Sequence, residues 1–140
     1  MIRLFKTEDS RAVVDLWYEA SILAHDFIDA SYWQEKKADM EQIYIPSSET
    51  YVYEQEHCIV GFVSLVENYI AAIFVAPNEQ GKGIGKELMQ FIKQKRSTLE
   101  LGVYAKNTNS IAFYEKQGFV VVEEKLDEST GEREVVMEYK

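Results

Sequence analysis

The sequence predicts a mixed α/β fold that is organised around one strand–helix–strand unit. Residues 71–75 form an apolar segment that is typical of a strand, and three glycines follow it at Gly81, Gly83 and Gly85. The next segment has helical periodicity in Ile84, Leu88, Phe91 and Ile92. A second apolar segment at residues 98–104 predicts the returning strand. Since such a connection is right-handed and joins parallel strands, we expect a parallel pair within residues 69–104.

The other elements follow from apolar periodicity and turn residues. A first helix carries Val13, Val14, Leu16 and Trp17, and Thr7 or Asp9 can cap it. Further helices are expected at residues 31–43, which Pro46 follows, and at residues 108–117. Additional strands are expected at residues 2–5, 51–53, 59–66 and 69–75, and as a final pair around a turn at residues 127–131. Residues 59–63 are apolar on both faces, which predicts a central strand.

Composition favours a small enzyme of a reducing compartment. Residues 1–140 suit one domain, and 46% of them are hydrophobic. No apolar segment is long enough to span a bilayer and no signal-peptide pattern is present, so we expect a cytoplasmic protein without a membrane partner. The single cysteine, Cys58, starts an apolar run and is predicted to be a core residue. A net charge of -9 without a basic cluster argues against nucleic acid as a partner.

The glycine-rich turn predicts a phosphate site. Glycines let the backbone approach a ligand closely, and the free amides at a helix N-terminus attract anions. A Walker A loop needs a glycine at position 80 and a hydroxyl residue at 87, where Gln80 and Glu87 stand. The dinucleotide fingerprint needs a third glycine at Lys86. The pattern that remains is Gln-x-x-Gly-x-Gly, formed by Gln80, Gly83 and Gly85.

A second motif accompanies this pattern. Asn107 is followed by Phe113 and Tyr114, and then by Gly118 and Phe119. The two motifs together, in this order and separation, resemble the GNAT superfamily of acetyl-coenzyme A-dependent N-acetyltransferases, with Ser110 in place of a usual alanine. The resemblance implies a mixed, mostly antiparallel sheet with a splayed central parallel strand pair flanked by helices. It also implies that residues 1–140 form a single N-acetyltransferase domain.

The resemblance assigns the binding of acetyl-coenzyme A. The backbone of Ile73, Phe74 and Val75 would pair with the pantetheine arm, and an amide near Phe74 or Val75 would bind the thioester carbonyl. Asn107 would hydrogen-bond the arm, and Tyr114 would act as general acid for the leaving sulfur. The pyrophosphate would be held by amides and local positive charge from Gly81, Lys82, Gly83, Ile84, Gly85 and Lys86.

The general base departs from the family pattern. Gly102 and the pair Ala71 and Ala72 stand where relatives often carry a carboxylate. Glu67 or Glu100 can act through water instead. His25 is the other candidate, because histidine titrates near neutral pH; a structural role at a helix end is an equal alternative. The spacing of histidine and cysteine predicts no metal site.

The resulting hypothesis is an enzyme that moves an acetyl group from acetyl-coenzyme A to a primary amine by direct attack in a ternary complex. The segment around His25 resembles that of bacterial protein-lysine acetyltransferases in the superfamily, which favours a protein or peptide lysine as acceptor. Small-molecule amines and protein N-termini stay open as alternatives. A catalytically weak sensor module that binds acetyl-coenzyme A is an alternative from another class, which Gly102 favours and Tyr114 disfavours. Oligomeric state cannot be predicted from these residues.

Overall fold

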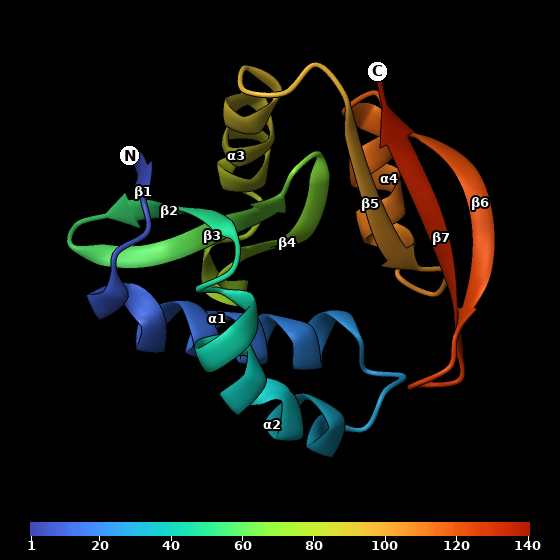
Figure 1. Cartoon of the computed structure of the whole chain (residues 1–140), viewed down its shortest axis with the longest axis horizontal. Coiled ribbons are helices and arrows are strands. Elements are labelled where there is room, and N and C mark those ends of the chain that lie inside the picture. The colour runs from blue at the N-terminus through green and yellow to red at the C-terminus, as the bar shows by residue number, and fades with distance from the viewer.

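A computed structural model describes all residues, Met1–Lys140. Seven strands form one sheet in the order β1-β2-β3-β4-β5-β7-β6, in which only β4 and β5 are parallel (Figure 1). The expected mostly antiparallel sheet with a central parallel pair is therefore confirmed. The strands are β1 (Ile2–Leu4), β2 (Glu49–Gln55), β3 (Cys58–Val66), β4 (Tyr69–Val75), β5 (Leu99–Tyr104), β6 (Val120–Asp127) and β7 (Glu132–Tyr139).

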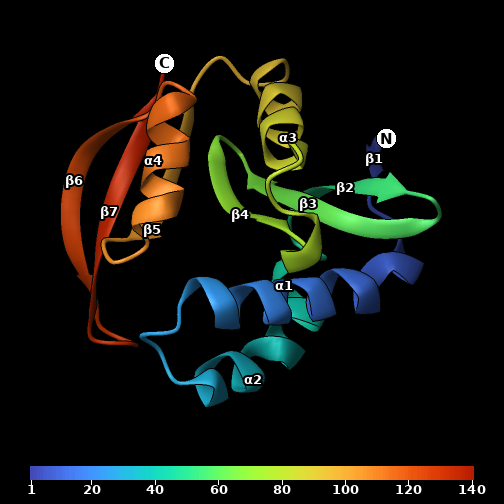
Figure 2. The same cartoon turned by 180° about the vertical axis from the view of Figure 1, so that it is seen from behind.

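The helices cover both faces of the sheet. Helix α3 (Ile84–Lys93) and helix α4 (Thr108–Lys116) lie side by side on one face, α3 against β3 and β4, and α4 against β5 (Figures 1 and 2). Helix α1 (Ser10–Ala24) and helix α2 (Ala30–Asp39) cover the other face and share a second apolar cluster with Val52 and Phe62. None of the helices is both long and apolar enough to cross a membrane.

Strands β4 and β5 touch only where they begin. Tyr69 pairs with Glu100 and Ile70 with Leu101, and the ladder then stops. On its other side β4 stays paired with β3, with a bulge at Ala71 between the Ile70 and Ala72 pairs. The β4 backbone from Ala71 to Val75 therefore has an edge toward β5 that the sheet does not use.

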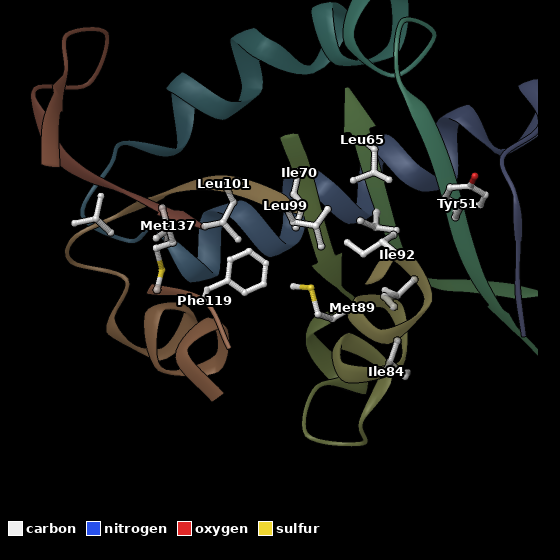
Figure 3. Packing of buried hydrophobic residues seen from close by; sticks show 14 of the residues in the cluster. Tyr51, Leu65, Ile70, Ile84, Met89, Ile92, Leu99, Leu101, Phe119 and Met137 are labelled. Atoms are coloured by element: carbon white, nitrogen blue, oxygen red, sulfur yellow. The ribbon is translucent and has the colours of Figure 1, made fainter. Parts of the chain in front are cut away.

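A continuous core holds the two halves of the sheet together at the paired end. Ile70 and Leu99 lie between Leu65 on one side and Leu101 on the other, and Met89 of α3 reaches toward Phe119 (Figure 3). Each of these six side chains is at most 4% exposed. Burial of apolar surface stabilises a fold by about 25 cal/mol per Å². The buried cluster therefore holds β4 and β5 together at their paired ends, while the two strands diverge farther along.

Four details differ from the sequence prediction. Cys58 is exposed rather than part of the core, because it lies beside the β2–β3 turn, where the strand has left the covering helices. Strand β2 begins at Glu49, before the expected residue 51. The second helix is α-helical only to Asp39 and ends in a π-helical turn, Met40–Tyr44, which leaves Ile43 exposed. Asp9 precedes α1 without capping it, because its carboxylate accepts hydrogen bonds from Arg3 and Lys6.

Candidate active site

The turn between β4 and α3 is open and exposes free amides. Gly81 and Gly83 have φ of 82° and 86°, and no atom lies within 4 Å of the position that a Cβ would take on either. Gly83 precedes α3 in the left-handed conformation, and no side chain caps the helix. The first amides of α3 therefore point out without intrahelical partners, which is the arrangement that binds phosphate groups. The side chain of Ile84 is buried, so only its backbone is available.

Side chains around the turn fix its position. The amide nitrogen of Gln80 donates to the carbonyl oxygen of Val75 at 3.2 Å, which ties the turn to the end of β4. Lys82 pairs with Glu79 at 2.9 Å, so part of its charge is already compensated. Lys86 is exposed on the first turn of α3. The positive charge here thus comes from the helix amides and Lys86, and Glu87 in the same turn opposes it.

The three predicted strand residues have side chains with structural roles. Ile73 and Val75 pack into the core under α3, whereas Phe74 stacks on Phe62 on the opposite face, with ring centroids 5.9 Å apart. Toward β5, the backbone groups of Ile73 and Val75 pair with no strand, and only the Val75 carbonyl oxygen has a partner, the Gln80 side chain. Core packing and backbone recognition are therefore compatible in the same residues.

Tyr114 lies in α4 among aromatic side chains. Its ring centroid is 5.5 Å from that of Phe113 and 5.9 Å from that of Phe119. Burial raises the pKa of the Tyr114 hydroxyl, and the nearby Tyr69 raises it further. The phenol is therefore protonated at neutral pH. Phe113 also lines the glycine turn, since a Cβ on Gly85 would lie 3.5 Å from the Phe113 ring, so α4 and the start of α3 share one site.

His25 ends α1 inside an aromatic pocket. It stacks on Trp33 with centroids 5.2 Å apart, meets the edge of Tyr104 at 5.2 Å, and is only 8% exposed. Burial lowers its pKa to about 4, against a smaller opposing effect of the Ser21 backbone. The ring is therefore neutral at pH 7, and its burial leaves it little access to an incoming amine or to solvent.

The neutral His25 ring instead contacts the motif asparagine. Its Nε2 atom lies 3.4 Å from Nδ2 of Asn107, which is a donor only. The Oδ1 atom of Asn107 accepts a hydrogen bond from the backbone N–H of Ser110 at 3.3 Å and so caps α4. One hydrogen on Nδ2 of Asn107 has no partner within the protein and is available to a ligand.

The two expected water-relay carboxylates lie toward the paired end of the strands. Glu67 is exposed in the turn between β3 and β4, with φ of 56°, and Glu100 is exposed opposite Tyr69. Sequence reasoning missed Glu134, a carboxylate that lies at the part of β5 that is not paired with β4. Glu134 of β7 reaches over Gly102, where a Cβ would lie 3.2 Å from its Cδ atom. Its place follows from strand register, with Gly102 opposite Val136 and Tyr104 opposite Glu134, which no sequence motif specifies.

Comparison with known proteins agrees with this geometry. The model of one protein family, described as an acetyltransferase (GNAT) domain, matches residues 19–140. Peptidyl-lysine N-acetyltransferase YiaC of Escherichia coli is 39% identical over 124 residues, covering 88% of this chain and 85% of YiaC. The solution structure of apo-form YjaB from Escherichia coli aligns with a TM-score of 0.87 at 25% identity, covering 99% of this chain and 96% of that one.

A more distant structure has the same fold. The PaiA N-acetyltransferase of Thermoplasma acidophilum, solved in complex with coenzyme A, aligns with a TM-score of 0.81 at 20% identity over 100% of this chain and 98% of that one. From the family match and the 39% identical relative, the chain belongs to the GNAT family of acetyltransferases and is an N-acetyltransferase.

The buried His25 makes a testable contribution to stability. Its pKa is lower in the folded chain than in the unfolded one, so folding is disfavoured once the unfolded chain takes up a proton. The free energy of unfolding should be highest above about pH 6.5 and should fall by about 3 kcal/mol between pH 6.5 and 4.

Urea unfolding at a series of pH values measures this. His25→Gln should remove most of the slope between pH 6.5 and 4, whereas the matched variant His57→Asn, in the exposed β2–β3 turn, should keep it. Asp9, whose pKa Arg3 lowers, contributes only below its ordinary value near 3.8. An unchanged slope in His25→Gln would contradict a buried neutral ring.

Proposed function

We propose that residues 1–140 act as one domain that moves an acetyl group from acetyl-coenzyme A to a lysine side chain of a protein or peptide, by direct attack in a ternary complex. The observation that carries the proposal is the meeting of three features at one end of the sheet. These are the unpaired edge of β4, the glycine turn before the uncapped start of α3, and helix α4, which carries Tyr114 and packs beside both.

The residues present fit the cofactor. Space above Gly81 and Gly83 and the free amides of α3 suit a pyrophosphate, to which Lys86 adds a positive charge. Of the three predicted residues Ile73, Phe74 and Val75, the first and last direct their backbone groups toward β5, which suits the amides of a pantetheine arm, as does the free hydrogen of Asn107. Acetyl-coenzyme A supplies a thioester, which is an acyl group with a good leaving group.

The protein has three chemical tasks in this reaction. Strand β4 presents an amide near Phe74 or Val75 to the carbonyl oxygen, where negative charge develops. Tyr114 is held protonated by burial and gives its proton to the leaving sulfur. The acceptor must arrive as a free amine, and lowering a lysine pKa from 10.4 to 7 costs about 4.6 kcal/mol.

In this proposal His25 is a positioning residue. As a neutral acceptor it holds the amide of Asn107, and as part of the aromatic pocket it joins α1 to β5 through Tyr104. This replaces the expectation that His25 itself removes the proton of the amine. The reason is geometric, because the ring is buried and its Nε2 atom contacts Asn107.

The proposal that lysine is the acceptor rests on the names of similar proteins. YiaC and YjaB are named peptidyl-lysine N-acetyltransferases, and YiaC covers most of this chain at 39% identity. A small-molecule amine, a protein N-terminus and a weakly active acetyl-coenzyme A sensor are the alternatives. Turnover of acetyl-coenzyme A on peptide libraries, read by mass spectrometry, distinguishes them. We expect acetylated lysine ε-amines; modification confined to α-amines or polyamines would exclude lysine, and no turnover would favour the sensor.

Cofactor binding tests the glycine turn. Gly85→Glu adds a negative charge beside the proposed pyrophosphate without requiring a positive φ, which Gly83 would need. Calorimetry should show coenzyme A binding lost in Gly85→Glu. Gly85→Ala is the matched control, because its methyl group meets Phe113 and Val75 at ordinary contact distances and adds no charge. Equal affinity in the glutamate variant and the wild type would remove the phosphate site.

Removal of one hydroxyl tests the general acid. Tyr114→Phe keeps the ring among Phe113 and Phe119, so the fold and coenzyme A affinity should persist. The turnover number should fall by about 10²–10⁴. Phe113→Leu, which changes a neighbouring ring without a hydroxyl, serves as the control for packing. A Tyr114→Phe enzyme as fast as the wild type would show that sulfur takes its proton from elsewhere.

A further inference from the structure

A carboxylate and a phenol occupy the space that a side chain at Gly102 would fill. A Cβ on Gly102 would lie 3.1 Å from the hydroxyl oxygen of Tyr69 and 3.2 Å from Cδ of Glu134. Such distances are too short for a further side chain unless one of these groups moves. Tyr69 comes from β4 and Glu134 from β7, so residues on both sides of β5 converge over it.

Strand register explains this convergence. Gly102 pairs with Val136 and Tyr104 pairs with Glu134, so Glu134 is a diagonal neighbour of Gly102 on the same face of the sheet. This is the face that carries Tyr104 and its contact with His25, opposite the core side chains Leu101 and Val103. Because Gly102 has no side chain, Glu134 and Tyr69 can both lie over this part of β5, next to the splayed strands.

Tyr69 links the carboxylate to the proposed general acid. The charge of Glu134 raises the pKa of Tyr69, after a larger effect of burial, and Tyr69 in turn raises that of Tyr114. The three groups are thus close enough to affect one another, although they come from β7, β4 and α4. Glu134 lies over Gly102, which follows the last residue of β5 that pairs with β4, so it borders the opening between β4 and β5 where the proposed function places the thioester.

Glu134 already binds an ammonium group in the structure. The Nζ atom of Lys125 on β6 lies 3.6 Å from one of its carboxylate oxygens, and the two side chains are 52% and 22% exposed. Exposed pairs of this kind contribute little to stability, so an incoming ammonium can displace Lys125 at small cost. The carboxylate keeps enough access to solvent to pass a proton on.

We propose that Glu134 receives the cationic amine of the acceptor and takes its proton, supplying from β7 the carboxylate that β5 lacks at Gly102. This rests on the proposed function. The proton moves from the ammonium to the Glu134 carboxylate and then to solvent. The freed nitrogen forms a bond to the carbonyl carbon, the carbon–sulfur bond breaks, and sulfur takes the Tyr114 proton. The second nitrogen proton returns to Tyr114 through solvent, so one proton is released overall.

A pair of variants separates this role from structure. Glu134→Gln and Lys125→Gln break the same ion pair, but only the first removes the carboxylate. With a lysine peptide at pH 7, Glu134→Gln should lower kcat/KM about 10²-fold or more, whereas Lys125→Gln should leave it nearly unchanged. With hydroxylamine, which is mostly uncharged at pH 7, Glu134→Gln should match the wild type. Equal losses in the two variants, or no loss in Glu134→Gln, would overturn the inference.

Moving the carboxylate back to β5 provides a rescue. Gly102 does not have a positive φ, and removing the Glu134 side chain relieves one of its two close contacts; the other is the hydroxyl end of Tyr69, which has to shift slightly. Glu134→Ala should be slow, and Glu134→Ala with Gly102→Glu should recover most of the lost rate. A double variant as slow as Glu134→Ala would count against a carboxylate requirement at this place.

Acceptor binding supplies a readout without turnover. Calorimetry of the coenzyme A-saturated protein should show a lysine peptide binding more weakly to Glu134→Gln than to the wild type or Lys125→Gln. The same peptide with acetylated lysine should not distinguish the variants. If the wild type bound coenzyme A but acetylated no amine, the proposed function would fail and this inference with it; activity retained in Glu134→Gln would overturn the inference alone.

Discussion

The two-residue contact between β4 and β5 is the constraint on which the site depends. A parallel pair inside a sheet normally stays hydrogen-bonded along its length, because unpaired backbone groups cost free energy. Here pairing ends after Ile70 and Leu101, and β4 continues with one edge free. The core around Leu99, Met89 and Phe119 offsets that cost by holding the halves together at the paired end. The free edge can then serve a ligand whose arm carries amides of its own.

The start of α3 is locally positive although the chain as a whole is negatively charged. A net charge of -9 repels a polyphosphate, and Lys82 is already paired with Glu79. The uncapped start of α3 supplies partial positive charge through its backbone, which needs no lysine. On the proposed acceptor side the same excess of acid is an advantage, since a carboxylate such as Glu134 attracts a cationic amine.

Motifs made one half of the site predictable and left the other half out of reach. The glycine turn and Tyr114 follow from short patterns, because a tight turn and a helix start depend on local residues. The succession of strands along the chain follows from the apolar runs. The exposure of Cys58 depends on where β3 leaves its covering helices, which no local pattern reveals. The low pKa of His25 comes from burial, to which Trp33 and the sequence-distant Tyr104 contribute by enclosing the ring. Glu134 comes from a strand that carries no motif and meets Gly102 only through register.

Hydrogen exchange of backbone amides with and without coenzyme A tests the central claim most directly. If the splayed edge holds the cofactor, coenzyme A should slow exchange in β4 from Ala71 to Val75 and in the turn from Gly81 to Gly85. The β6–β7 hairpin, which is paired along its length except for a bulge at Val122, should change little. Slowed exchange confined to the glycine turn, with β4 unaffected, would contradict the account, because the divergence of β4 from β5 would then have no ligand to serve.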